Sequence, residues 1–159
     1  MLQVQIITDI ATEPVTLSEV KEFLQIDYSD FDDLLTDLIT VARQASERNT
    51  GLAYGEKVIQ ITGNDEDERI YPITPIPGDS EVTWVNESTD GTTDYRYKAG
   101  YGISDSGIET EALPAALKNA ILKRVATAFR KRDNEAEAMK LASDASQVTE
   151  LMYRKVFVV

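Results

Sequence analysis

The sequence predicts an α+β fold that is mainly α, a small helical bundle with an inserted antiparallel β-sheet. Two long segments, residues 29–51 and 113–132, carry apolar residues at gaps of three and four, which is typical of amphipathic helices. Between them, short segments alternate apolar and polar residues, which is typical of strands. The 159 residues fit one domain, 1–159, made of an N-terminal strand and helices (1–51), a β insertion (52–103), and a C-terminal helix and tail (104–159).

The chain before residue 29 predicts a strand and a short helix. Leu2, Val4 and Ile6 alternate with glutamines, which indicates the strand. Thr16 and Glu19 have the spacing of a capping box, in which each side chain accepts a hydrogen bond from the other residue's backbone N–H. The helix that follows is expected to end near residues 26–27 and to bury four apolar side chains: Leu17, Val20, Phe23 and Leu24.

The segment 29–51 predicts the central helix. Ser29 or Asp30 is the expected N-cap, and Gly51 the expected stop, because glycine adopts the left-handed conformation past a helix end at little cost. The apolar stripe is expected to form the core: Phe31, Leu34, Leu35, Leu38, Ile39, Ala42 and Ala45. The polar residues are expected mainly on the other side: Asp30, Asp33, Thr40, Arg43, Glu47 and Arg48.

The β insertion is expected to contain four strands. Their predicted ranges are Lys57–Thr62, Arg69–Ile73, Glu81–Val85 and Thr92–Lys98. Residues 63–65 predict a turn, and the Asp-Gly pair at residues 90–91 predicts a hairpin. In the last strand, Tyr95, Tyr97 and Ala99 are expected on one face, with Arg96 and Lys98 on the other.

A second long helix is expected to start at residues 113–114, with proline in the first turn, and to end near residues 133–134. Its predicted apolar stripe is Leu117, Ala120, Ile121, Val125, Ala128 and Phe129. The chain finishes with four apolar residues, Val156–Val159. We expect this tail to be ordered by packing on a neighbouring subunit, on a partner protein or on the chain's own sheet.

Charge and composition limit the functions that this chain can have. It has 16 basic and 28 acidic residues, a net charge of −12, and neither histidine nor cysteine. The net charge argues against a protein whose whole surface binds nucleic acid. However, residues 112–132 contain six basic residues and no acidic one, so a nucleic-acid-binding module that uses this basic helix is the alternative function. No apolar run approaches the ~20 residues that span a bilayer, so no membrane is expected.

Candidate sites of chemistry are scarce. Asp30, Asp32, Asp33 and Asp37 suit a metal site, and hence a carboxylate–metal hydrolase, but a solvated helix N-terminus is the favoured interpretation. The segment 95–98, Tyr-Arg-Tyr-Lys, suits base stacking, but ordinary packing is favoured. No nucleophile or phosphate-loop spacing is present, so we expect no enzyme, no cofactor and no metal.

Residues along most of the chain resemble the tailed-phage head–tail connector proteins, also called head-completion or adaptor proteins. The resemblance is clearest at residues 13–51 and 97–132, and it lies in the order and spacing of these pieces: Glu13–Leu17, Glu19, Phe23, Leu24, Ile26, Asp27, Asp32–Leu35, Ile39, Ala42, Arg43, Glu47, Thr50, Gly51, Tyr97–Gly102, Leu113, Pro114, Leu117, Lys118, Ala120, Ile121, Arg132 and Glu150–Arg154.

The resemblance implies a non-enzymatic structural virion protein built from helices, with a β insertion in the longer members. It implies a homo-oligomeric ring, expected to be dodecameric, below the portal at the head–tail junction. Such a ring extends the DNA channel and provides a docking surface for a tail or stopper protein. The implied partners are therefore other copies of the chain, the portal and the tail or stopper protein, with DNA only as passing cargo. The implied location is the virion, after assembly in the host cytoplasm.

A ring needs two different patches on each subunit that meet on adjacent copies. We therefore expect an oligomer interface between a basic patch on the second long helix and an acidic patch on the central helix: Lys123, Arg124, Arg130, Lys131 and Arg132 against Asp30, Asp33 and Asp37. Residues near the C-terminus are the expected partner-docking site: Tyr153, Arg154, Val156, Phe157 and Val158.

Overall fold

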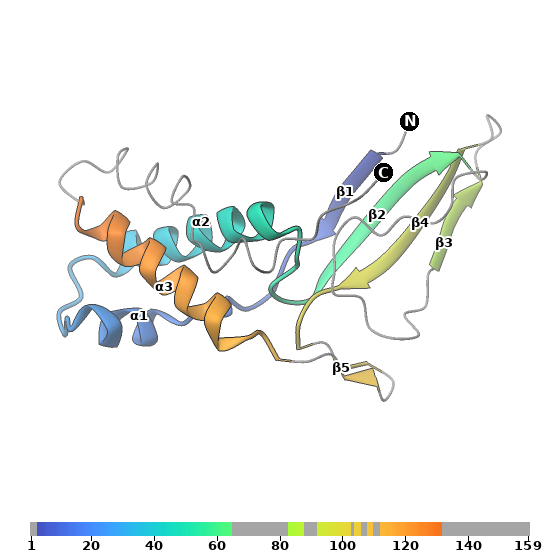
Figure 1. The fold of residues 1–159 in the computed structure, drawn as a ribbon. Coiled ribbons are helices and arrows are strands. Elements are labelled where there is room, and N and C mark those ends of the chain that lie inside the picture. The colour runs from blue at the N-terminus through green and yellow to red at the C-terminus, as the bar shows by residue number, and fades with distance from the viewer. Residues whose placement is uncertain are drawn as a thin grey trace. The chain divides into compact units, whose positions relative to one another are not determined.

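The computed structural model describes residues 3–64, 83–87, 92–102, 104–105, 108–109 and 112–131. The chain forms two compact units (Figure 1). The sheet unit comprises Met1–Thr12 and Leu52–Ala112, and the helical unit comprises Glu13–Gly51 and Leu113–Val159. Together, the described helices and strands confirm the predicted mainly α, α+β fold with an antiparallel sheet.

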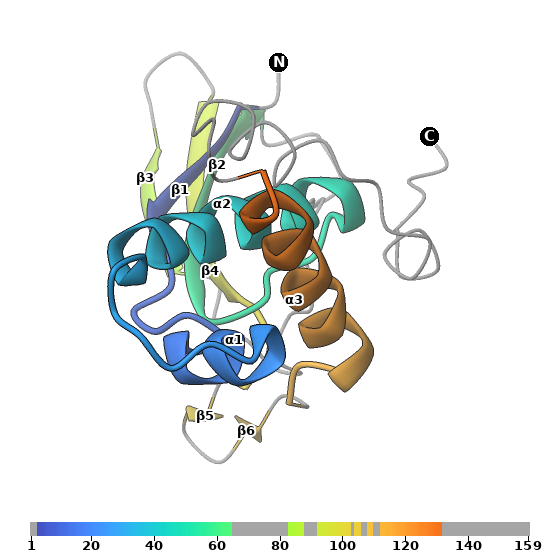
Figure 2. The ribbon, with the colours of Figure 1, turned by 90° about the vertical axis from the view of Figure 1, so that its left-hand side faces the viewer.

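The helical unit contains α1 (Leu17–Leu24), α2 (Asp32–Thr50) and α3 (Ala115–Phe129), each of which contacts the other two (Figure 2). Most of the predicted stripe of α2 is buried, whereas Phe31 and Leu34 are only partly so. All residues of the predicted apolar stripe of α3 are also buried. Gly51 ends α2 in the left-handed conformation, with φ 70°, as its position after the apolar stripe predicts.

Four local details of the helices differ from the prediction. Phe31, with no side-chain hydrogen bond, is the N-cap of α2, so neither Ser29 nor Asp30 caps the helix. Pro114 is the N-cap of α3 rather than a residue of its first turn, and α3 ends at Phe129, before residues 133–134. Phe23 is exposed rather than buried, because Val20 fills the inward side of this two-turn helix.

The capping box of α1 forms as predicted. The Glu19 backbone N–H donates to Thr16 Oγ1 (3.2 Å), and the Thr16 backbone N–H donates to Glu19 Oε2 (2.7 Å). The backbone N–H and hydroxyl of Thr16 both donate to the Glu19 carboxylate, and these hydrogen bonds lower the pKa of Glu19. The chain therefore begins α1 at a defined residue with a charged cap.

We expect Glu19→Gln to destabilise the protein at neutral pH but not in acid. Because the folded-state pKa of Glu19 is lowered, its contribution is present above the unfolded pKa of about 4.3 and is lost as the pH falls through the folded value. Urea unfolding of both proteins between pH 7 and pH 3 measures the difference in free energy of unfolding. A difference that stays constant over this range would contradict the assigned role, and Glu22→Gln, on the exposed side of the same helix, is the control.

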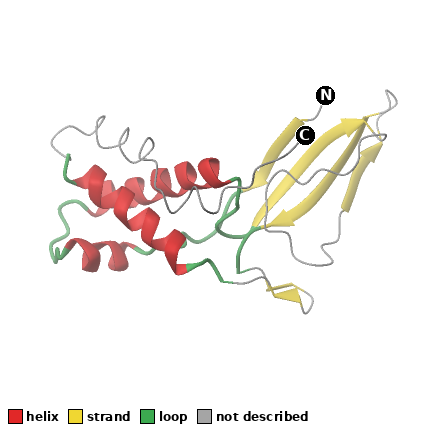
Figure 3. Ribbon diagram, in the orientation of Figure 1, coloured by secondary structure: helices red, strands yellow, loops and turns green. Residues whose placement is uncertain are grey.

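The sheet unit contains a four-stranded antiparallel sheet in the order β1-β2-β4-β3 (Figure 3). The strands are β1 (Gln3–Thr8), β2 (Lys57–Asn64), β3 (Thr83–Glu87) and β4 (Thr92–Ala99). A separate two-stranded sheet pairs β5 (Ser104–Asp105) with β6 (Ile108–Glu109). Gly63 and Asn64, predicted in a turn, instead belong to β2, in which Asn64 lies opposite Thr92, and residue 65 lies outside the described residues. The predicted strand 69–73 and the hairpin residues 90–91 lie outside the described residues.

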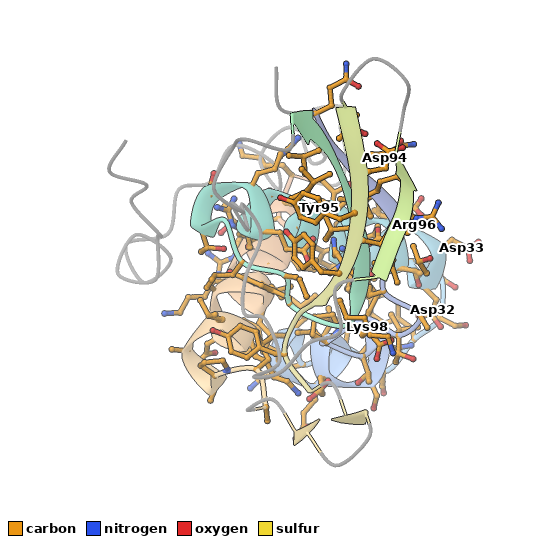
Figure 4. The ribbon with its side chains drawn as sticks, turned by 90° about the vertical axis from the view of Figure 1, so that its right-hand side faces the viewer. Asp32, Asp33, Asp94, Tyr95, Arg96 and Lys98 are labelled. Atoms are coloured by element: carbon orange, nitrogen blue, oxygen red, sulfur yellow. The ribbon has the colours of Figure 1, made fainter. Side chains whose placement is uncertain are left out.

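Cross-strand register gives the sheet one apolar face. Ile59 lies opposite Tyr97, and Ile61 opposite Tyr95, and all four side chains are buried. On the other face Arg96 Nε donates to Gln60 Oε1 (2.9 Å), and the two residues are paired in register. Figure 4 shows Tyr95 and Arg96 on opposite sides of β4, as strand alternation predicts.

Candidate assembly surfaces

The exposed side of α3 carries a basic surface, which we define as Lys123, Arg130 and Lys131. All three side chains are exposed, and the Thr127 hydroxyl on the same side donates to the Lys123 carbonyl (2.8 Å). Arg130 and Lys131 follow the last helical residue in a turn, with Arg130 still in the helical conformation (φ −62°, ψ −18°). Among the described residues, none of the three cations forms an ion pair.

Arg124 does not belong to this surface. Sequence reasoning grouped it with its basic neighbours, but its side chain is fully buried within the chain. It follows Lys123 by one residue, and a rotation of about 100° per residue carries it onto the side of α3 that holds Leu117, Ile121 and Val125. Arg132 lies outside the described residues.

The start of α2 carries an acidic surface, which we define as Asp30, Asp33 and Asp37. All three side chains are exposed, and none pairs with a cation among the described residues. The neighbouring Asp32 behaves differently, because Lys21 of α1 reaches its Oδ1 at 2.8 Å. Of the four aspartates, Asp32 therefore forms an ion pair that joins α1 to α2, whereas the three residues of the acidic surface face solvent.

An aromatic contact joins the start of α2 to the end of α3. The Phe31 and Phe129 rings lie 5.5 Å apart in an edge-to-face arrangement, and Tyr28 packs on Phe31 at 6.0 Å. The two charged surfaces thus belong to helix ends that are packed against each other. Tyr28 remains exposed beside them, which leaves an apolar group available for a partner.

Arg43 is buried on α2, although the sequence predicts it mainly on the polar side of the helix. Arg43 is 2 % exposed, and its Nε lies 2.9 Å from Glu13 Oε2 while its Nη1 lies 2.8 Å from Glu47 Oε2. Thr40 donates to the other Glu13 oxygen (3.1 Å). The spacing of Arg43 and Glu47 is a helical i,i+4 pair that the sequence does show, whereas Glu13 is brought in only by the fold.

The tyrosines of β4 do not form a base-stacking platform. Tyr95 and Tyr97 are buried in the apolar cluster of the sheet unit with Ala53, Ile59, Ile61 and Ala99. Stacking on bases requires exposed ring faces, so the favoured interpretation of ordinary packing is confirmed. On the opposite face, Lys98 is 3.5 Å from Glu56, which partly neutralises its charge.

The described residues contain no group of three or more histidine, cysteine, aspartate or glutamate side chains that could hold a metal ion. None of their helices is both long enough and apolar enough to cross a bilayer. The expected docking residues Tyr153, Arg154, Val156, Phe157 and Val158 lie outside the described part of the chain.

Residues 14–72 match the family described as "Phage gp6-like head-tail connector protein". This match confirms the resemblance to head–tail connector proteins. The connector match begins just before α1 and includes α1, α2 and β2. None of the curated protein sequences matches the chain.

Two solved structures share the fold of nearly the whole chain. One is a chain of "Virion of native gene transfer agent (GTA) particle", with a TM-score of 0.72 and 17% identity, over 99% of this chain and 97% of that chain. The other belongs to "Neck of empty GTA particle computed with C6 symmetry", with a TM-score of 0.66 and 14% identity, over the same shares. At these identities the likeness concerns the fold.

Proposed function

We propose that this chain is a non-enzymatic structural protein of a virion neck, which forms a homo-oligomeric ring between the portal and the tail. The observation that carries this proposal is the connector match over residues 14–72. The fold shared with proteins of gene transfer agent particles, one of them described as a neck, supports it. In this role, the ring extends the DNA channel, and DNA is passing cargo rather than a bound ligand.

The charged surfaces supply a way to close such a ring. The acidic surface lies on α2 and the basic surface on α3, so each can meet the opposite surface of a different neighbouring copy. Although the Phe31–Phe129 contact brings these helix ends together, the two surfaces form no ion pair with each other. Both remain available to partners.

Charge chiefly decides which surfaces meet, while apolar contact supplies the affinity. An exposed ion pair contributes only about 0.2–1 kcal/mol, but complementary charge sets orientation and association rate. Exposed aromatic residues are typical anchors of protein interfaces, and the exposed Tyr28 lies against Phe31, the N-cap residue of α2. Of the expected docking residues, Tyr153 and Arg154 would then contact the portal or the tail protein.

We expect Arg130→Glu with Lys131→Glu to leave the subunit folded but to impair ring formation, because like charges would then face each other. Adding Asp33→Lys and Asp37→Lys should partly restore assembly by exchanging the signs of the two surfaces. Sedimentation velocity over a concentration series, with and without portal protein, measures assembly, and a thermal melt checks folding.

Arg48→Glu is the control, because Arg48 is also exposed but lies at the other end of α2. It should assemble like the unaltered protein. Normal rings from the double variant would show that these charges do not orient the subunits. An unaltered protein that stays monomeric with portal present, and binds DNA with strong salt dependence, would favour the nucleic-acid-binding alternative.

A further inference from the structure

β1 is an edge strand that carries exposed apolar side chains. Among the strands that the structure describes, it pairs only with β2 and lies at the end of the four-stranded sheet (Figure 3). Of the five large apolar side chains that are exposed in the described residues, three lie on β1: Val4 (43%), Ile6 (46%) and Ile7 (40%). Edge strands are ordinarily protected by charged residues or proline, and the sequence of β1, QVQIIT, contains neither.

The exposed side chains continue the buried face of the sheet. Val4 lies opposite Ile61, and Ile6 lies opposite Ile59. Because these two residues of β2 in turn lie opposite the buried tyrosines of β4, each β1 side chain extends a row of side chains that crosses three strands. Along each row the residues on β2 and β4 are buried, whereas the residue on β1 is nearly half exposed. The apolar face is thus incomplete at this edge, and one more strand would cover it.

We propose that the open edge of β1 accepts the C-terminal segment Val156–Val159 of a second copy as an added strand. This segment is Val-Phe-Val-Val, which combines high strand propensity with apolar side chains on both faces. It ends a stretch of 28 residues after Lys131, which at about 3.3 Å per residue can extend roughly 90 Å, enough to reach an adjacent subunit.

The occupant is assigned to a second copy because of the symmetry of a ring, and this reason rests on the proposed function. The donor segment and the acceptor edge are different parts of the subunit. Each copy can therefore donate its segment to one neighbour and accept a segment from the other, so that in a closed ring every β1 edge is paired.

The test uses the chain lacking residues 156–159 and a fluorescent synthetic peptide of residues 150–159 as the probe. We expect saturable binding by fluorescence anisotropy. Val4→Lys with Ile6→Lys should weaken binding by about tenfold or more, because two apolar contacts are replaced by charges. Gln3→Lys with Gln5→Lys is the matched control, since it places the same charges on the other face of β1 and should bind as the parent does. Equal weakening by both pairs, or no binding by the parent, would overturn the proposal.

Hydrogen exchange of full-length protein distinguishes a second copy from the chain's own tail. Protection of the β1 amides should rise with protein concentration as subunits exchange tails. Protection that is independent of concentration would overturn the assignment to a second copy. The result is separable from the ring proposal: rings that form without peptide binding at β1 refute only this inference, and peptide binding by a protein that never forms rings refutes only the proposed function.

Discussion

Gly100→Ala should destabilise the sheet unit by several kcal/mol, more than any other single methyl group added at a described glycine. Gly100 has φ +138°, and a Cβ atom there would lie 1.9 Å from the Gly55 carbonyl oxygen and 2.4 Å from the Gly55 carbonyl carbon. Backbone strain of this kind costs about 1–3 kcal/mol, and overpacking adds about 1–3 kcal/mol. Because the obstructing atoms are backbone, rotation of a side chain cannot relieve the contact.

Gly102→Ala is the matched control for this prediction. Gly102 also has a positive φ, +69°, but a Cβ atom there would meet nothing within 4 Å. The Gly102→Ala variant should therefore lose only about 1–2 kcal/mol of free energy of unfolding, which is the cost of placing a non-glycine residue in the left-handed conformation. Urea unfolding followed by circular dichroism measures both free energies. Equal losses for the two variants would mean that the close approach of Gly55 and Gly100 has no energetic consequence.

Arg43→Met should destabilise the helical unit by about 3–5 kcal/mol. The guanidinium bridges Glu13 and Glu47, and Glu47 lies one turn further along α2. Removing the cation leaves two partly buried carboxylates without the charge that they face. Arg43→Lys should recover only part of the loss, since a lysine ammonium lacks the planar fork that bonds both carboxylates at once.

Arg48→Met provides the comparison, because Arg48 is an exposed arginine on the same helix. Its effect on the free energy of unfolding should stay within about 0.5 kcal/mol. Chemical denaturation followed at the helical circular dichroism band reports both variants. If Arg43→Met were no more harmful than Arg48→Met, the network would be a consequence of packing rather than a source of stability.

Local pattern predicts the start of α1 and the end of α2 correctly, because the signals that act there are local. The capping box at Thr16 and Glu19 and the glycine at residue 51 act through hydrogen bonds and backbone angles within a few residues. The apolar stripe of α2 predicts the buried side because burial follows the helical period. The same logic fails for Phe23, since a helix of eight residues has room for few inward positions.

The candidate surfaces could be predicted only in part. Residue type and spacing identified Lys123, Arg130, Asp33 and Asp37 as exposed charges, and the structure places them so. Arg124 has the same residue type as its exposed neighbours, but its position around the helix axis buries it. Charge by itself does not show whether an arginine is solvated, because a buried partner can compensate the cost of removing it from water.

The sequence by itself determined which segments form the three helices and the strands β1 to β4, which faces of α2, α3 and β4 are apolar, and the resemblance to connector proteins that the family match confirms. The tertiary structure alone decided which strand lies at the edge, and that Glu13 meets Arg43 thirty residues later. The physical reason is the range of the interactions. Capping and periodicity act over one or two helical turns, whereas strand pairing and buried ion pairs join residues whose proximity depends on the path of the whole chain.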